Sequence, residues 1–197
     1  ATVDIYLMRS IWGGENAGVV AVKTVTILPA VPSPSPDQFR HEKNNGDCPG
    51  SGNPGVGNPC NPANGNKYQT ERDYVTGEGV PSVVRHYNSL LVSKDYSLGF
   101  GWTWLAVRKL EIYGTLIQVR EGDGRGEPFT KNSSGQWVGD ADTKITLTQD
   151  STGYSLSRQD GSIERYDTSG KLVSETDRNH RTTAYTYNGA GKLASVT

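Results

Sequence analysis

Three histidines are the side chains of this sequence best suited to acid–base chemistry near neutral pH. His41 lies in a segment expected to be a loop, His86 in an expected strand and His180 in an expected turn. No Gly-x-Ser-x-Gly motif or comparable Ser or Cys motif accompanies them, so a catalytic triad is not expected. We therefore predict that the chain is not an enzyme and needs no cofactor.

Two further groupings have some features of ligand sites but lack essential parts. Residues 122–127, Gly-Asp-Gly-Arg-Gly-Glu, look like a phosphate-binding loop. They lack the Lys-Ser or Lys-Thr ending and the following helix, and their acidic residues would repel phosphate, so we predict a hairpin turn. Asp140 and Asp142, with Asp123 or Asp150, could supply oxygen ligands for calcium, but their spacing does not match a calcium-binding loop. No metal site is predicted, and a structural ion is the alternative.

The two cysteines, Cys48 and Cys60, lie in a segment too rich in Gly, Pro and Asn to form a core of its own. A disulfide between them would close a loop of about a dozen residues and stabilise the chain by about 3 kcal/mol on the chain-entropy model. Free thiols are the alternative, and a zinc site would need ligands that the neighbourhood does not supply. We predict a disulfide, which would place maturation outside the reducing cytosol.

Aromatic residues suggest one binding surface. Trp102 and Trp104 are two residues apart and therefore lie on one face of a strand, where exposed indoles can stack on sugar rings. Core packing is the favoured alternative for such a pair. Exposure of both indoles would favour binding, and burial would remove its main support.

The overall composition favours an all-β fold. Hydrophobic residues make up 34% of the chain, which has 24 Gly and 10 Pro, and these numbers favour short strands separated by turns over long helices. The 20 basic and 21 acidic residues are interspersed, so neither nucleic acid nor membrane surfaces are expected partners. The sequence has no apolar run long enough to span a membrane and no recognisable signal peptide.

Alternating apolar residues predict short antiparallel strands and hairpins along the chain. Near the N-terminus, residues 2–11 and 18–28 predict two strands joined through a Gly-rich turn, and a Pro-rich stretch follows them. After residue 67 the predicted strands are 68–75, 80–87, 105–112, 116–120, 144–148, 154–159 and 163–166.

The strongest internal signal is a repeat near the C-terminus. The segment 166–172, Tyr-Asp-Thr-Ser-Gly-Lys-Leu, recurs as 187–193, Tyr-Asn-Gly-Ala-Gly-Lys-Leu, at an offset of 187 − 166 = 21 residues. Each copy predicts a hairpin with an Asp or Asn that caps its own turn and a Gly in the left-handed region. The residues that define the repeat are Tyr166, Asp167, Gly170, Leu172, Tyr187, Asn188, Gly191 and Leu193.

A hairpin repeat cannot bury its apolar face alone, and the pattern reaches Thr197 without a Pro, a bulge or a polar cap. We therefore expect the C-terminal edge to be covered, either by further repeats or by a neighbouring protein chain.

These residues resemble the YD-repeat proteins, a family that includes bacterial Rhs proteins, the C components of insecticidal toxin complexes and animal teneurins. One part of the match is the repeat pair with its link at 175–180, which has Asn179-His180 where the family usually has Gly, and Asn188 stands where the family has Asp. The other part resembles the entry domain that precedes Rhs arrays, at residues 57–69, 73–74, 85–88 and 98–102. The resemblance covers about residues 57–197.

The resemblance implies a large β shell that encloses or displays another polypeptide, often a toxin, in secretion, delivery or adhesion. The family's enzymatic parts have no counterpart here, so the chain is expected to be a non-catalytic, secreted or cell-surface scaffold. The expected architecture is all-β, with a shell-like or solenoid-like YD-repeat sheet. Its expected parts are an N-terminal β arm (1–28), a Pro-rich linker (29–45), an Rhs-like entry domain (46–110) and the YD-repeat sheet (111–197).

Two other functions stay open. The N-terminal strands could complete a neighbour's open edge, which would make the chain a homo-oligomer and a subunit of an extracellular fibre. The pair Trp102 and Trp104 could make it a carbohydrate-binding adhesin.

Overall fold

The computed structural model describes residues 2–8, 19–26, 40, 42–43, 45, 60–61, 64–74 and 83–197, and for 2–8, 19–26 and 60 the backbone alone. His41, Cys48 and the Pro-rich stretch from 29 to 39 lie outside the described residues. The chain divides into two units, residues 1–33 and 34–197. We describe each unit by itself.

The first unit contains an antiparallel hairpin. Strand β1 (Thr2–Met8) pairs with β2 (Val19–Thr26), with Thr2 opposite Thr26 and an irregularity between Leu7 and Met8. Both strands predicted near the N-terminus are confirmed, and both are shorter than their apolar stretches.

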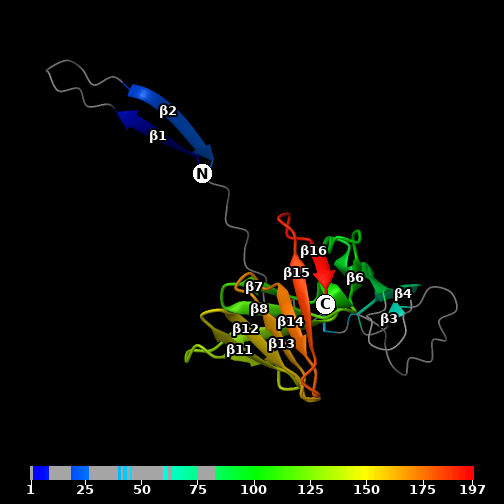
Figure 1. The fold of residues 1–197 in the computed structure, drawn as a ribbon. Coiled ribbons are helices and arrows are strands. Elements are labelled where there is room, and N and C mark those ends of the chain that lie inside the picture. The colour runs from blue at the N-terminus through cyan, green and yellow to red at the C-terminus, as the bar shows by residue number, and fades with distance from the viewer. Residues whose placement is uncertain are drawn as a thin grey trace. The chain divides into compact units, whose positions relative to one another are not determined.

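The second unit contains three antiparallel sheets, in each of which the strands follow the order of the sequence (Figure 1). The entry sheet consists of β3 (Cys60–Asn61), β4 (Asn66–Tyr74), β5 (Val83–Asn88) and β6 (Trp102–Trp104). The middle sheet consists of β7 (Lys109–Tyr113), β8 (Leu116–Arg120), β9 (Gly126–Lys131) and β10 (Trp137–Gly139). The repeat sheet consists of β11 (Thr146–Asp150), β12 (Gly153–Ser157), β13 (Ile163–Tyr166), β14 (Leu172–Thr176), β15 (Thr182–Tyr187) and β16 (Leu193–Val196).

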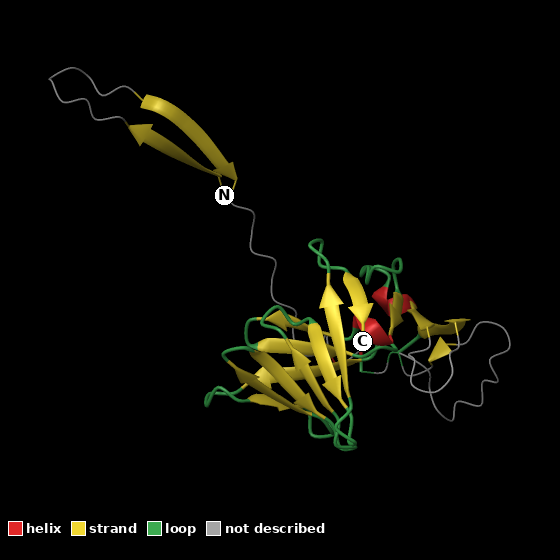
Figure 2. Ribbon diagram, in the orientation of Figure 1, coloured by secondary structure: helices red, strands yellow, loops and turns green. Residues whose placement is uncertain are grey.

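Two short 3-10 helices, η1 (Ser89–Leu91) and η2 (Leu105–Val107), flank β6 in the sequence (Figure 2). The predicted strand at 105–112 therefore begins late, because η2 occupies its first turn and the strand starts at Lys109. Among the residues that the model describes, no helix is long and apolar enough to cross a membrane.

The main core lies between the middle and repeat sheets. Ile117 and Val119 of β8 are fully buried there, in one cluster with Leu156 and Leu172 of the repeat sheet. The opposite face of β8 is buried as well: Arg120 is fully buried and pairs with Glu42. The middle sheet is thus covered on both faces, which explains why all five residues of β8 are inaccessible.

Residues near the end of the predicted linker take part in this second covering layer. Asn45 is buried and donates from its side chain to the carbonyl of Gly124, while Arg40 and Lys43 pair with Asp140. The segment predicted as a linker, 29–45, therefore ends in side chains that pack on the middle sheet. Composition gave no sign of this, because the contacts are individual charge pairs.

Strand β9 was not predicted, and its Pro128 is one reason, since Pro is rare inside a sheet. The backbone N–H of Lys131 donates to Thr115 at 2.8 Å, so by alternation the nitrogen of Pro128 faces away from β8. On its other side β10 pairs with β9 only as far as Phe129. Pro128 therefore removes no hydrogen bond from either neighbouring strand.

Candidate functional site

Six hairpin turns in the middle and repeat sheets share one pattern of backbone hydrogen bonds. In each turn the N–H of the first residue donates to the carbonyl of the fifth, and the N–H of the fourth donates to the carbonyl of the first, at 2.8–3.1 Å. The fourth residue has a positive φ of 62–90°. The turns span residues 121–125, 132–136, 158–162, 167–171, 177–181 and 188–192. Residues 122–127 therefore form a hairpin turn and the start of β9, as predicted.

In four of these turns the first residue is Asp or Asn, and its Oδ1 accepts hydrogen bonds from two backbone N–H groups. Asp167 accepts from Ser169 and Lys171 at 2.9 Å each, and Asn188 accepts from Ala190 and Lys192 at 3.0 Å each. Since an amide oxygen and a carboxylate oxygen both accept such bonds, Asn188 fills the position of the family's Asp. Asn132 and Asp177 have the same contacts, so the turn occurs more often than the sequence repeat.

The left-handed fourth position differs between the turns. Gly170 has φ 85°, and a Cβ there would lie 2.2 Å from the carbonyl oxygen of Leu110, so both conformation and space require glycine. Gly191 has φ 74°, but the nearest atom to a Cβ would be the mobile Nζ of Lys171 at 3.1 Å. His180 takes the same position with φ 62° and an exposed side chain.

The repeat-defining aromatic and aliphatic residues come together in the core. Tyr166 and Leu172 are 2% and 0% exposed, whereas Tyr187 and Leu193 are half-buried and pack on the same cluster. The hydroxyl of Tyr187 donates to the carbonyl of Leu172 at 2.8 Å, which joins the second repeat unit to the first.

A buried ion network joins the segment after the entry sheet to the repeat sheet. Arg108, which follows η2 and is 5% exposed, pairs with Glu164 of β13 and, at 2.6 Å, with Glu175 of β14. It also donates to the Tyr185 hydroxyl of β15 at 3.1 Å. Arg158 adds bonds to Glu121 at 2.9 Å and to Glu164 at 3.1 Å. Three consecutive strands of the repeat sheet are thus held by one guanidinium.

The network changes the acidity of its carboxyl groups in opposite directions. Burial raises the pKa of Glu121, and the charge of Arg158 offsets this only in part. Burial alone would raise the pKa of Glu175, but the hydrogen bond and charge of Arg108 outweigh it and hold that pKa below its ordinary value. Glu175 is therefore ionised when the protein is folded near neutral pH.

A second buried network lies on the other face of the middle sheet. Glu111 of β7 accepts from Arg120 at 3.1 Å, from Lys94 at 2.8 Å and from the Tyr96 hydroxyl at 2.8 Å. Burial opposes ionisation of Glu111, but Arg120 and Lys94 outweigh it and lower its pKa to about 2. This network attaches the loop after η1 to the middle sheet.

Neither network was predicted from the sequence, because interspersed charges give no signal of which will be buried. The only local signal is in β13, where Ile163 is 43% exposed and its neighbour Glu164 is fully buried. This is the reverse of the orientation expected for a half-buried strand.

The histidines lie on separate elements. The Nδ1 of His86 on β5 is 2.6 Å from the Tyr68 hydroxyl, and burial lowers the pKa of its ring. His180 is exposed in the turn 177–181, and His41 lies outside the described residues. Within the described part of the chain, no cluster of three His, Cys, Asp or Glu side chains could hold a metal ion.

The paired cysteines stay a prediction, because Cys48 lies outside the described residues. Cys60 is in β3, where its backbone is opposite Lys67 of β4.

Trp102 and Trp104 are both half-buried on β6. The guanidinium of Arg85 covers the ring of Trp102 at 4.6 Å, and Tyr87 packs against it at 5.4 Å. Trp104 packs on the main core. The two indoles therefore do not form the open pair that sugar stacking needs.

Trp104 also lines a cleft of about 630 Å³ beside the second repeat unit. On one side lie the loop around Ser97 and η2 with Lys109, and on the other lies the hairpin formed by β15 and β16. Its lining includes the apolar side chains of Ala106, Tyr187, Leu193 and Val196 and the ammonium groups of Lys109, Lys171 and Lys192.

Comparison with known families agrees with this geometry. Residues 57–129 match the model described as a domain of unknown function, DUF6531, and residues 166–197 match the RHS Repeat model. No curated protein matches the chain. The second match covers the two repeat units whose turns are described above.

Antiparallel sheets extended by one recurring hairpin turn define the class: an all-β repeat module. The chain is a YD-repeat protein of the Rhs type. Repeats of this family are generally structural and non-catalytic, and they typically occur in extracellular or cell-surface proteins.

Proposed function

We propose that this chain is a secreted or cell-surface scaffold that encloses or displays another polypeptide. One observation carries the proposal: the two repeat units extend a single sheet by the same turn, and Tyr187 of the second bonds to Leu172 of the first. A unit that adds one hairpin to the previous one in this way is suited to building a wall.

The ion network supports the scaffold role. Arg108 connects the region before the middle sheet to three strands of the repeat sheet, so the start of the repeat sheet is fixed to the entry segment. A buried charge that is fully paired favours one arrangement of its neighbours, because any other arrangement leaves the charge unpaired. Such a junction gives the wall a defined starting direction.

The test is electron microscopy of the native polypeptide that contains these residues, combined with protease protection. We expect a hollow particle in which a second polypeptide resists protease until the particle is opened. Particles without an interior, or a second polypeptide digested at the rate of the free one, would contradict enclosure. A second polypeptide held on the outer surface would support display instead.

A second candidate is a fibre subunit, which the hairpin of β1 and β2 supports. A two-stranded hairpin is at best marginally stable alone in water, so a partner chain that extends it would stabilise it. Sedimentation of the chain with and without unit 1–33 tests this proposal. Assembly that persists after the deletion would contradict strand donation by the arm.

The carbohydrate alternative has the weakest support, because Arg85 covers Trp102 and Trp104 packs on the core. We do not develop it.

A further inference from the structure

The cleft beside the second repeat unit exposes the edge of a strand. All four residues of β16 line it, and successive side chains of a strand point to opposite faces, so the strand must present its edge to the cleft. Thr197 and Ala184 exchange backbone hydrogen bonds at 3.0 and 2.7 Å. By alternation the N–H and C=O groups of Ala194 and Val196 therefore point away from β15. Among the described strands, β15 is the sole partner of β16.

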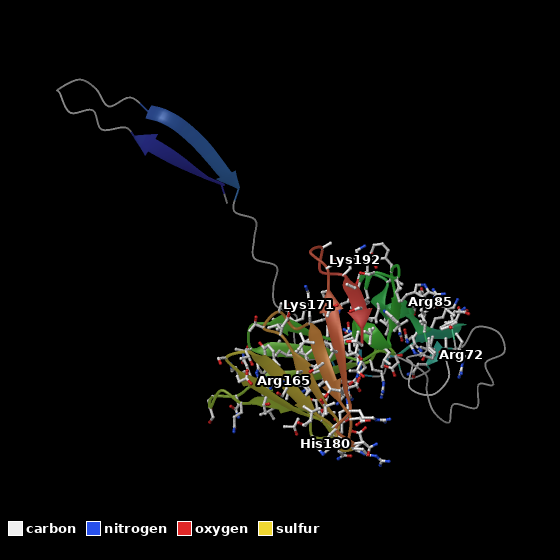
Figure 3. The ribbon with its side chains drawn as sticks, in the orientation of Figure 1. Arg72, Arg85, Arg165, Lys171, His180 and Lys192 are labelled. Carbon is white, nitrogen blue, oxygen red and sulfur yellow. The ribbon has the colours of Figure 1, made fainter. Side chains whose placement is uncertain are left out.

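The electrostatics of the cleft favour negative charge. Lys109, Lys171 and Lys192 line it, against one acidic side chain, Asp95. Figure 3 places Lys171 and Lys192 at the same end of the sheet, opposite to His180. Arg108 also lines the cleft, but Glu164 and Glu175 neutralise its charge. The lysines give the cleft a surplus of positive charge.

The lysine side chains lie beside aromatic rings. The ammonium of Lys171 is 5.3 Å from the ring of Tyr187, and that of Lys109 is 4.7 Å from the ring of Tyr96. Within the described part of the chain, neither Lys171 nor Lys192 takes part in an ion pair with a carboxylate. Carboxylates of a ligand would therefore meet ammonium groups that no described acidic side chain neutralises.

We propose that this cleft binds an extended, acidic segment of a separate polypeptide, which adds as a strand to the free edge of β16. Its backbone bonds to Ala194 and Val196, its carboxylates pair with Lys171 and Lys192, and its apolar side chains contact Trp104 and Tyr187. Strand addition supplies affinity through the main chain and selectivity through the side chains. The proposal rests on the proposed function in that the bound segment belongs to the polypeptide that the scaffold holds.

The experiment measures binding of a labelled, acetylated hexapeptide, Glu-Val-Glu-Val-Glu-Val, to the purified chain by fluorescence anisotropy. The matched probes are Lys-Val-Lys-Val-Lys-Val and an acidic peptide with N-methylated valines. We expect the acidic peptide to bind, with affinity that falls as NaCl rises from about 0.05 to about 0.5 M. We expect the N-methylated peptide, which lacks half of the backbone donors, to bind about tenfold more weakly.

The protein variant is Lys171→Gln combined with Lys192→Gln, and its matched control is Lys144→Gln, an exposed lysine outside the cleft. We expect the double variant to weaken binding about fivefold or more, and the control to leave it unchanged. Circular dichroism establishes that both variants are folded. Equal binding of the basic peptide, an equal loss in the control, or no binding of the acidic peptide by the folded chain would overturn the proposal.

The same measurement separates this site from its rivals. If peptide binding is lost in a polypeptide extended beyond Thr197, the chain's own following strand fills the cleft and the proposal is overturned. If the peptide binds but electron microscopy shows no second polypeptide held by native particles, the site stands and the scaffold proposal fails.

Discussion

The two repeat units have nearly the same sequence pattern but different surroundings. In the first unit Tyr166 and Leu172 are 2% and 0% exposed, and the turn at 167–171 lies against β7. In the second unit the equivalent Tyr187 and Leu193 are half-buried, and the turn at 188–192 leaves space around Gly191. The pattern therefore specifies the hairpin, while the neighbouring sheet decides how much stability each residue contributes.

The glycines of the two turns give the largest expected contrast. Gly170→Ala forces a Cβ to within 2.2 Å of the Leu110 carbonyl oxygen at positive φ, and we expect a loss of about 3 kcal/mol or more. Gly191→Ala meets only the conformational cost, about 1 kcal/mol. Urea denaturation of both variants measures the difference. Equal losses would show that the contact with β7 contributes nothing.

The leucines test the same contrast in the core. Leu172→Ala removes a fully buried side chain, and we expect a loss of about 3 kcal/mol in the free energy of unfolding. Leu193→Ala removes a half-buried one, and we expect about 1 kcal/mol. The urea midpoints should separate accordingly. If the order is reversed, the second unit is the better packed of the two.

The carboxylates of the Arg108 network predict how acid affects the junction of the units. Because the pKa of Glu175 is lowered in the folded state, its stabilisation is present above the ordinary pKa of Glu and is lost as pH falls through the lower, folded value. We expect Glu175→Gln to cost about 2 kcal/mol at pH 7 and to reduce the decline in stability below about pH 4.5.

Thermal unfolding as a function of pH measures this decline. Glu111→Gln is the comparison variant, since its carboxyl, with a pKa of about 2, belongs to the other buried network. An unchanged acid decline in the Glu175→Gln variant would show that this network does not control the junction.

The turn at 177–181 gives the smallest effect. His180 holds the left-handed position with φ 62°, where an L residue is strained. We expect His180→Gly to stabilise the protein by about 0.5 kcal/mol, since the relief of strain exceeds the entropic cost of glycine. A raised melting temperature would confirm this. Arg178→Gly, in the same exposed turn, is the control that should not stabilise.

Much of the fold follows from local sequence. Asx and Gly residues at fixed spacing specify the hairpin turns, and alternating residues specify strands such as β8 and β12, because both depend on neighbours in the chain. The repeat was visible for the same reason. Its Asn188 variant also keeps the turn, since the turn requires only a side-chain oxygen.

The tertiary structure decided which of these local units are buried. No property of residues 163 and 164 in isolation places Glu164 inside and Ile163 outside; the pairing of Glu164 with Arg108, 56 residues earlier, makes that orientation stable. The same holds for Glu42 on Arg120 and for the cleft between η2 and β16. By itself the sequence determined the hairpins and their repetition. The charge networks and the cleft required the fold, because their partners are distant in the chain and meet only when the sheets pack.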